Sequence, residues 1–169
     1  MTSYKFLAKG AIGPLSGHVW PEPGRWLEAS GPLVVCSRGI HVCRPEDLAH
    51  WLHDELWQVE TEGEALEALD CTVVRRARLV RRIDAWSTGG AARFAEACIE
   101  HAQALDGAAA FIDDARMARD AGYLAVSAFC SALAVAELDP GAVTERAFRR
   151  ERSWQAGWIT RELIATSTL

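Results

Sequence analysis

The stretch Ser87-Thr88-Gly89-Gly90 divides the 169-residue chain into two halves whose sequence patterns differ. Residues 1–86 contain five of the six prolines, all but one of the histidines and several short runs of β-branched residues. Residues 87–169 are rich in alanine and carry apolar residues at helical spacing. We therefore expect an α+β protein. A small mixed or antiparallel sheet from the first half would pack against a helical layer from the second, in one compact unit.

Composition limits the classes of protein to which the chain can belong. Half of the residues are apolar and no apolar run is long enough to cross a bilayer, so we expect a soluble globular protein. The first residues lack the pattern of a secretory signal, and the five cysteines form no disulfide framework, which favours the cytoplasm. A net charge of -5 disfavours nucleic acid and anionic membranes as partners. The oligomeric state does not follow from the sequence.

The first half predicts a small sheet with one helix. Alternating or compact apolar runs predict strands over residues 4–7, 40–43, 56–60 and 72–83. Pro45 and the two acids after it predict a helix that runs to about Asp54. Residues 61–70 read as an acidic connection. The last strand has arginines on both faces, so we expect an exposed strand or one at an edge of the sheet.

The second half predicts four helices. Their expected ranges are residues 91–105, 108–118, 121–138 and 139–164. Asp139-Pro140 favours a helix start, because an acceptor cap precedes a proline at the first helical position. In the first of these helices Phe94, Cys98, Ile99 and Ala102 form one stripe, which should face a core.

Reactive side chains are densest between Cys36 and Cys43. Alternation along the strand places His41 and Cys43 on one face. With Cys36, and with His50 or His18 to complete the set, these residues could bind zinc. A Cys/His nucleophile pair is a second interpretation, and buried structural cysteines are a third. The spacing leaves these alternatives open, and we predict no metal.

His41 and Glu60 are the candidate catalytic residues. Glu60 closes the apolar strand over residues 56–60, and we expect that strand to lie beside the one carrying His41. A carboxylate beside an imidazole can orient its tautomer, and the imidazole can then act as acid or base near neutral pH. The pair predicts acid–base chemistry that needs no cofactor.

Tryptophans and arginines supply the candidate binding residues. Indole rings make apolar walls, and guanidinium groups can bind an anionic substituent with two hydrogen bonds. The predicted binding residues are Trp20, Trp26, Trp51, Trp57, Arg76 and Arg78. We therefore expect an aromatic-lined pocket for a small organic molecule, with isomerisation, cyclisation or hydrolysis as the reaction.

Residues 4–86 also resemble a broad group of bacterial and phage proteins. The residues that carry the resemblance are Cys36, Gly39, Ile40, His41 and Cys43 in a Cys-x-x-Gly-hydrophobic-His-x-Cys motif, Asp47-Leu48 and Trp51-Leu52 in the predicted helix, and Glu60 with Gly63-Glu64 after the next strand. That family has no settled activity. The resemblance therefore implies a shared motif and no particular reaction.

A second similarity is to the split sheet of ADP-ribosyl-transferring proteins. In them a strand with a Gly-x-His/Tyr pattern and a later strand with a glutamate flank NAD. Gly39-Ile40-His41 and Glu60 are similar to these two elements, and Tyr4-Lys5-Phe6-Leu7 lacks the arginine or histidine of their first strand. This similarity implies NAD as a ligand.

Three functional hypotheses follow from the residues and the resemblances. The first is a small-molecule enzyme that works by acid–base chemistry at His41 and Glu60. The second is a non-catalytic module that binds a partner protein through its arginines and tryptophans. The third is an NAD-using protein of the ADP-ribosyl-transferring kind.

Overall fold

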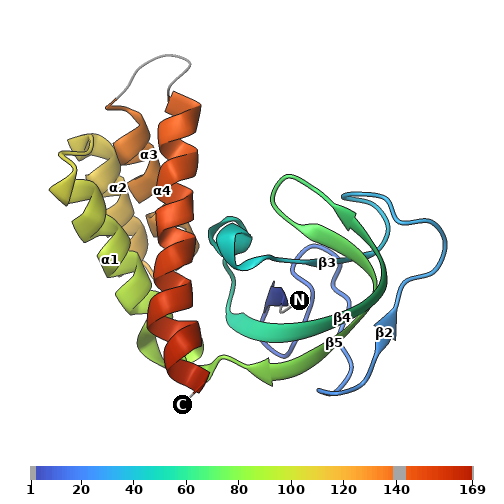
Figure 1. Cartoon of the computed structure of the whole chain (residues 1–169). Helices are drawn as coiled ribbons and strands as arrows, with labels where there is room; N and C mark the ends of the chain where they lie inside the picture. The colour runs from blue at the N-terminus through green and yellow to red at the C-terminus, as the bar shows by residue number, and fades with distance from the viewer. Residues whose placement is uncertain (1–2, 139–143, 169) are drawn as a thin grey trace. The chain divides into compact units, whose positions relative to one another are not determined.

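The computed structural model describes residues 3–138 and 144–168, and its contacts divide the chain into two units, Met1–Ser87 and Thr88–Leu169. The first, which we call the sheet unit, holds an antiparallel sheet, and the second, the helical unit, holds helices (Figure 1). The predicted α+β class is confirmed. No helix within the described ranges has both the length and the apolar composition that a bilayer crossing requires.

The sheet unit has five strands that pair antiparallel throughout. Their bounds are β1 (Ser3–Leu7), β2 (Leu27–Glu28), β3 (Ile40–Val42), β4 (Glu55–Glu67) and β5 (Thr72–Arg82). The strand order is β1-β4-β5-β2. β3 also pairs with β5, at residues 72–74, whereas the short β2 pairs with residues 76–77. Strands β4 and β5 form a long curved hairpin to which the other strands attach (Figure 1).

Four of these strands form a closed ring. β1 pairs with β4, β4 with β5 and β5 with β3. Cys43, the residue after β3, pairs with Tyr4 of β1. Tyr4 N–H donates to the Cys43 carbonyl at 2.9 Å and Cys43 N–H donates to the Tyr4 carbonyl at 2.7 Å, which joins β3 to β1. Closure leaves few unpaired edges and an inner face for the core. That core contains Leu7, Trp20, Ile40, Val42, Val59, Val74, Ala77 and Leu79.

Two sequence predictions for the hairpin are wrong. Residues 61–67 continue β4 instead of forming a connection, because a bulge between Glu62 and Ala65, with Gly63 at φ 84°, interrupts the alternation that would have revealed a strand. β5 lies inside the sheet, with β4 on one side and β2 and β3 on the other. Its arginines are accommodated because glutamates of the neighbouring strand pair with them across the exposed face.

The helix predicted from Pro45 to about Asp54 is shorter, a 3-10 helix η1 (Pro45–His50) that ends at Trp51. Backbone N–H of Trp51 donates to the Leu48 carbonyl at 3.2 Å, and the Trp51 indole N–H donates to the Asp70 carbonyl at 2.7 Å. The second bond uses Trp51 to attach the end of η1 to the turn between β4 and β5.

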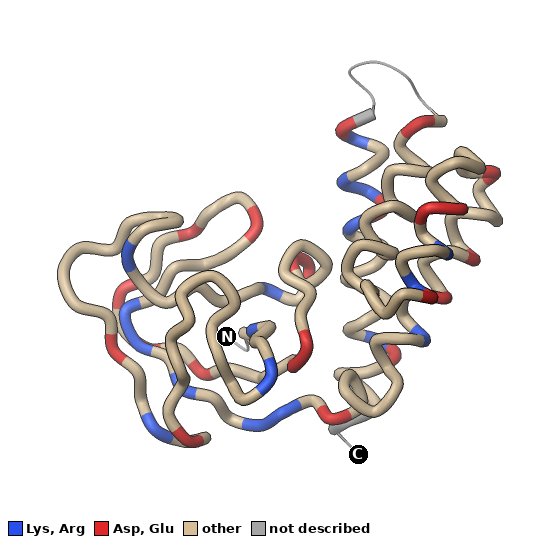
Figure 2. The backbone as a smooth tube through the Cα atoms, turned by 180° about the vertical axis from the view of Figure 1, so that it is seen from behind, with Lys and Arg blue, Asp and Glu red and all other residues tan. Residues whose placement is uncertain are grey.

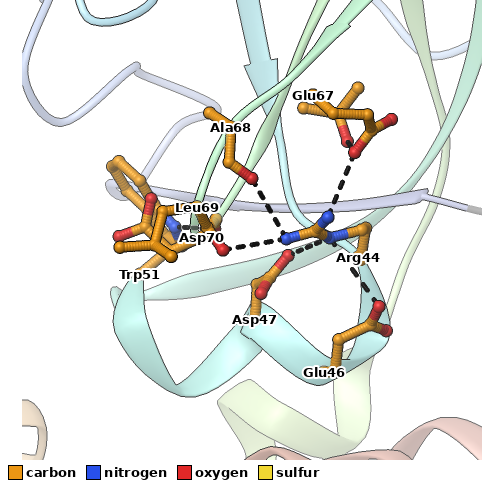
Figure 3. A network of polar contacts seen from close by, with 9 residues as sticks. Arg44, Glu46, Asp47, Trp51, Glu67, Ala68, Leu69 and Asp70 are labelled. Carbon is orange, nitrogen blue, oxygen red and sulfur yellow. Dashed lines mark hydrogen bonds and ion pairs between the residues drawn. The ribbon is translucent and has the colours of Figure 1, made fainter. Parts of the chain in front are cut away.

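Arg44 makes the same attachment from the other side (Figure 3). Its guanidinium donates to Asp47 of η1 at 2.5 Å and to Glu67 of β4 at 3.1 Å. It also donates to the carbonyl oxygens of Ala68 at 3.3 Å and Leu69 at 3.0 Å. Because one charged group satisfies acceptors from three segments, the end of the hairpin is held against η1.

The helical unit follows an irregular turn η2 (Trp86–Gly90), in which Gly89 has φ 96°. Its helices are α1 (Ala91–Ala104), α2 (Ala109–Asp120), α3 (Leu124–Ala136) and α4 (Thr144–Ile159), which continues through η3 (Thr160–Ile164) and η4 (Ala165–Thr168). The predicted stripe of Phe94, Cys98, Ile99 and Ala102 is buried, as expected. The predicted helix start at Asp139-Pro140 lies outside the described residues.

A buried polar cluster ties three of these helices together. His101 Nδ1 of α1 lies 3.0 Å from Glu151 Oε1 of α4. Arg152 donates to the Gln155 side-chain oxygen at 2.7 Å, and Gln155 donates to the Ala128 carbonyl of α3 at 2.8 Å. The cluster satisfies polar groups that would otherwise destabilise the alanine-rich interior.

Candidate functional site

Lys5 lies in β1 on the face that is directed toward the core of the closed sheet. It shares that face with Leu7, because residues two apart in a strand point the same way, and Leu7 belongs to the core. Trp57 is its direct partner across β4. The Lys5 ammonium lies 5.7 Å from the centre of the Trp20 ring, and the residue is half-buried. Two indole-bearing residues therefore flank a lysine that solvent still reaches.

A buried carboxylate positions both tryptophans. Glu55, at the start of β4, is 8% exposed and accepts hydrogen bonds from Gly10 N–H at 3.0 Å, Ala11 N–H at 3.2 Å and the Trp57 indole N–H at 3.0 Å. Trp20 N–H in turn donates to the Ala11 carbonyl at 2.9 Å. Burial by itself would raise the pKa of Glu55, but these hydrogen bonds and the charge of Arg82 outweigh it and lower the pKa.

The Lys5 amine donates a hydrogen bond to the backbone carbonyl of His41 at 2.6 Å. Within residues 3–138 and 144–168 no carboxylate forms an ion pair with it. Burial lowers the pKa of Lys5. A larger fraction of this amine is therefore neutral near pH 7 than in an ordinary lysine.

The cysteines near Lys5 are neutral thiols. Burial raises the pKa of Cys43 to about 12 and also raises the pKa of Cys71. All five cysteines of the chain are free. In the part of the chain that the structure describes, no three side chains among His, Cys, Asp and Glu converge as metal ligands would, and this includes Cys36, His41 and Cys43.

The His41 ring holds a turn of the backbone. Its Nε2 accepts the Cys36 N–H at 3.0 Å, and Cys36 has φ 60°, a conformation that favours glycine. Burial and then the Lys5 charge lower the pKa of His41, while a hydrogen bond with the Gly39 backbone opposes them. The ring lies on the face of β3 opposite to Ile40 and Val42, which belong to the core. Its lone pair is already used within the turn.

The predicted proximity of His41 and Glu60 is wrong. β5 lies between their strands, with Val73 opposite His41 and Arg78 opposite Glu60 in the register. Glu60 Oε2 accepts two hydrogen bonds from the Arg78 guanidinium, at 2.8 Å and 2.6 Å. The expected acid–base pair is therefore not assembled.

The predicted binding residues separate into three groups. Trp51 lies at the end of η1, where its indole N–H donates to the Asp70 carbonyl. Trp20 and Trp57 lie beside Lys5, as described above. Trp26 instead lies between two guanidinium groups, 4.8 Å from Arg76 and 4.7 Å from Arg78. These arginines alternate along β5 with the core residue Ala77, so Trp26 covers the face opposite to the core.

The exposed face around Trp26 is a ladder of ion pairs. We use the name Arg–Glu ladder for Arg76 and Arg78 of β5 with Glu62 and Glu60 of β4, which pair at 2.9 and 2.6 Å. Both signs of charge follow the backbone of this unit (Figure 2). Because carboxylates already face Arg76 and Arg78, the predicted role of these two residues in binding an anion loses its basis.

Sequence reasoning missed Lys5. The chain holds 18 basic residues, of which only Lys5 and Lys9 are lysines. A charged residue within the apolar strand Tyr4-Lys5-Phe6-Leu7 was a further signal, because a charge on the inner face of a strand is costly unless it has a role. The composition and the position together single out this lysine.

Comparison with protein-family models, with curated proteins and with solved structures finds no match for the chain. The resemblance to the bacterial and phage family, and the similarity to ADP-ribosyl-transferring proteins, therefore stay predictions.

Proposed function

We propose that the sheet unit binds a small organic molecule beside Trp20 and Trp57 and performs cofactor-independent acid–base chemistry on it, with Lys5 as the base. The observation that carries the proposal is the Lys5 amine: half-buried, hydrogen-bonded to one carbonyl and without a carboxylate partner among the described residues. A general base can take a proton from the substrate in isomerisation and cyclisation, and from the attacking water in hydrolysis. The role first assigned to His41 passes to Lys5.

The environment of Lys5 supports this role in two ways. A general base must be unprotonated in a useful fraction at the working pH, and burial shifts Lys5 in that direction. The partly exposed Trp57 ring gives a small organic molecule apolar surface on the same face as the amine. His41 contributes its backbone carbonyl, which orients the amine.

Proton abstraction can be tested with 5-nitrobenzisoxazole, a chromogenic probe for bases beside aromatic surfaces. The base takes the ring C–H proton, the C–H electron pair forms a nitrile, the N–O bond breaks and a coloured phenolate is released. We expect the wild-type protein to catalyse this elimination and Lys5→Met to lose about 100-fold or more of the rate.

Lys9→Met is the matched control, because Lys9 is exposed and lies on the same short segment. It should retain the wild-type rate. Equal rates for Lys5→Met and the wild type, with both proteins folded by circular dichroism, would refute Lys5 as the base. Replacement of Trp57 by Phe should raise KM more than it lowers kcat, since this partly exposed ring contributes binding surface.

The partner-protein hypothesis retains the surface around Trp26. Arginine and tryptophan are frequent at the centres of protein interfaces. Its weakness is that Glu60 and Glu62 already neutralise Arg78 and Arg76 within the unit. The acid–base proposal is therefore the better supported of the two.

A further inference from the structure

We infer that the Lys5 amine is a nucleophile that condenses with aldehydes and ketones, so that the ligands of this site are carbonyl compounds. This inference deepens the proposed function and rests on the same site. It adds a covalent step, which the acid–base proposal does not require.

The composition of the chain marks Lys5 as unusual. Only two of its 18 basic residues are lysines. An arginine keeps its proton at every pH that a protein experiences, whereas a lysine can lose its proton and then present a lone pair. Arginines supply the cations of the Arg–Glu ladder on the outer face. A lysine, Lys5, occupies the inner-face position in β1.

The contacts of the amine suit a nucleophile. A carboxylate partner would stabilise the ammonium form, and the described residues supply none. The neighbouring Cys43 is a neutral thiol, so it adds no negative charge. The His41 carbonyl can accept an N–H bond from the neutral amine as well as from the ammonium. That bond fixes the nitrogen while its lone pair remains available.

The covalent step needs no oxidant or reductant. The lone pair of Lys5 adds to the carbonyl carbon, forming a C–N bond, while the C=O π electrons move to oxygen and take a proton from solvent. The resulting carbinolamine loses its hydroxyl group as water, with a proton from nitrogen returned to solvent, and an imine remains. Apolar ligand groups would lie against the partly exposed Trp57.

Reductive trapping tests the inference in the wild-type protein. The full chain is treated with propanal and cyanoborohydride at about pH 7, which reduces each imine to a stable secondary amine. Cleavage at arginine releases residues 1–25, a peptide that contains Lys5, Lys9 and the α-amino group of the chain. Fragment ions then assign the label to each amine. We expect several-fold more label on Lys5 than on the exposed Lys9.

A pH series separates reactivity from accessibility. If Lys5 reacts faster because more of it is neutral, its label relative to Lys9 should fall as the pH rises toward about 10.4, the ordinary lysine pKa. Lys5→Arg should lose the excess label, and Lys9→Arg should keep it. Label on Lys9 equal to or above that on Lys5 at about pH 7 would overturn the inference, as would a label ratio independent of pH.

The two proposals can fail separately. Lys5-dependent elimination of 5-nitrobenzisoxazole without preferential trapping would remove the covalent step and keep the acid–base function. Preferential trapping without Lys5-dependent elimination would keep the nucleophile and remove the base. Absence of both would remove the site.

Discussion

Lys5 and the arginines of β5 are cations against indole rings, but the sheet unit places them on opposite faces. Lys5 lies on the inner face beside Trp20, with a backbone carbonyl as its hydrogen-bond acceptor. Arg76 and Arg78 lie on the outer face around Trp26, and each pairs with a glutamate of β4. The same two residue classes therefore occur in two very different electrostatic environments.

The difference shows how the partner of a cation decides its chemistry. Glutamates neutralise the charge of the ladder arginines and orient their side chains, which suits a structural surface. Lys5 has no such partner among the described residues, and burial favours its neutral form. Four predictions test this difference between Lys5 and the ladder arginines.

The largest expected effect is on stability and concerns the turn just before β3, the strand whose His41 carbonyl accepts the hydrogen bond from Lys5. Gly39 has φ 125°, and a Cβ there would lie 2.3 Å from Val73 Cγ1 and 3.0 Å from Leu33 Cδ2. We expect Gly39→Ala to lower the free energy of unfolding by about 4 kcal/mol, through backbone strain and overpacking.

Gly24→Ala is the matched control, because Gly24 also has a positive φ, +88°, and a Cβ added there would have no neighbouring atom within 4 Å. It should cost about 1 kcal/mol in urea unfolding. Equal costs would show that β3 tolerates the shift.

The second prediction compares two glutamates of β4. Glu55→Ala removes the acceptor of three N–H groups and should cost about 3 kcal/mol, whereas Glu60→Ala, at an exposed ion pair, should cost about 0.5 kcal/mol. The lowered pKa of Glu55 means that its contribution is present above about pH 4.3 and is lost as the pH falls further. Urea unfolding of both variants at neutral and acid pH measures this. A pH-independent deficit for Glu55→Ala would contradict the assignment.

The third prediction concerns the cost of a charge at Lys5. Because burial lowers the pKa of Lys5, the folded protein binds fewer protons than the unfolded chain between the lowered value and about pH 10.4. The stability of the wild type relative to Lys5→Met should therefore rise as the pH increases from about 7 to about 9.5. Lys9→Met is the matched control for the loss of one positive charge. A constant difference would mean that folding leaves the pKa of Lys5 unshifted, and a falling difference would mean that Lys5 is stabilised as an ammonium; either result would contradict the prediction.

The smallest expected effect is at the Arg–Glu ladder. A double-mutant cycle with Arg78→Ala and Glu60→Ala should give a coupling of about 0.5 kcal/mol, because both side chains are partly exposed. The coupling should weaken in high salt. The same variants should leave the propanal labelling of Lys5 relative to Lys9 unchanged. A change in that labelling would show that the two faces of the sheet are coupled.

The extent to which the fold could be predicted depended on whether a pattern was local. The strand over residues 4–7 and the stripe from Phe94 to Ala102 were evident, because apolar periodicity reflects burial on one side of an element. The extension of β4 to Glu67 was missed, because the bulge at Gly63 breaks the alternation. For the proposed site, Trp20 and Trp57 were predicted to be binding residues, which stays a prediction, whereas Lys5 was not singled out.

The residues alone determined that the first half forms strands, that the second half forms helices, and that aromatic and ionisable side chains gather in the first half. Apolar residues recur every two residues on the buried side of a strand and about every 3.6 residues on the buried side of a helix, so the sequence shows which side of an element is buried. The tertiary structure alone decided which strands are neighbours. It placed β5 between His41 and Glu60, and it joined β3 to β1 so that the His41 carbonyl meets the Lys5 amine. Pairing between distant segments depends on the whole set of contacts that closes the sheet, and no local pattern encodes it.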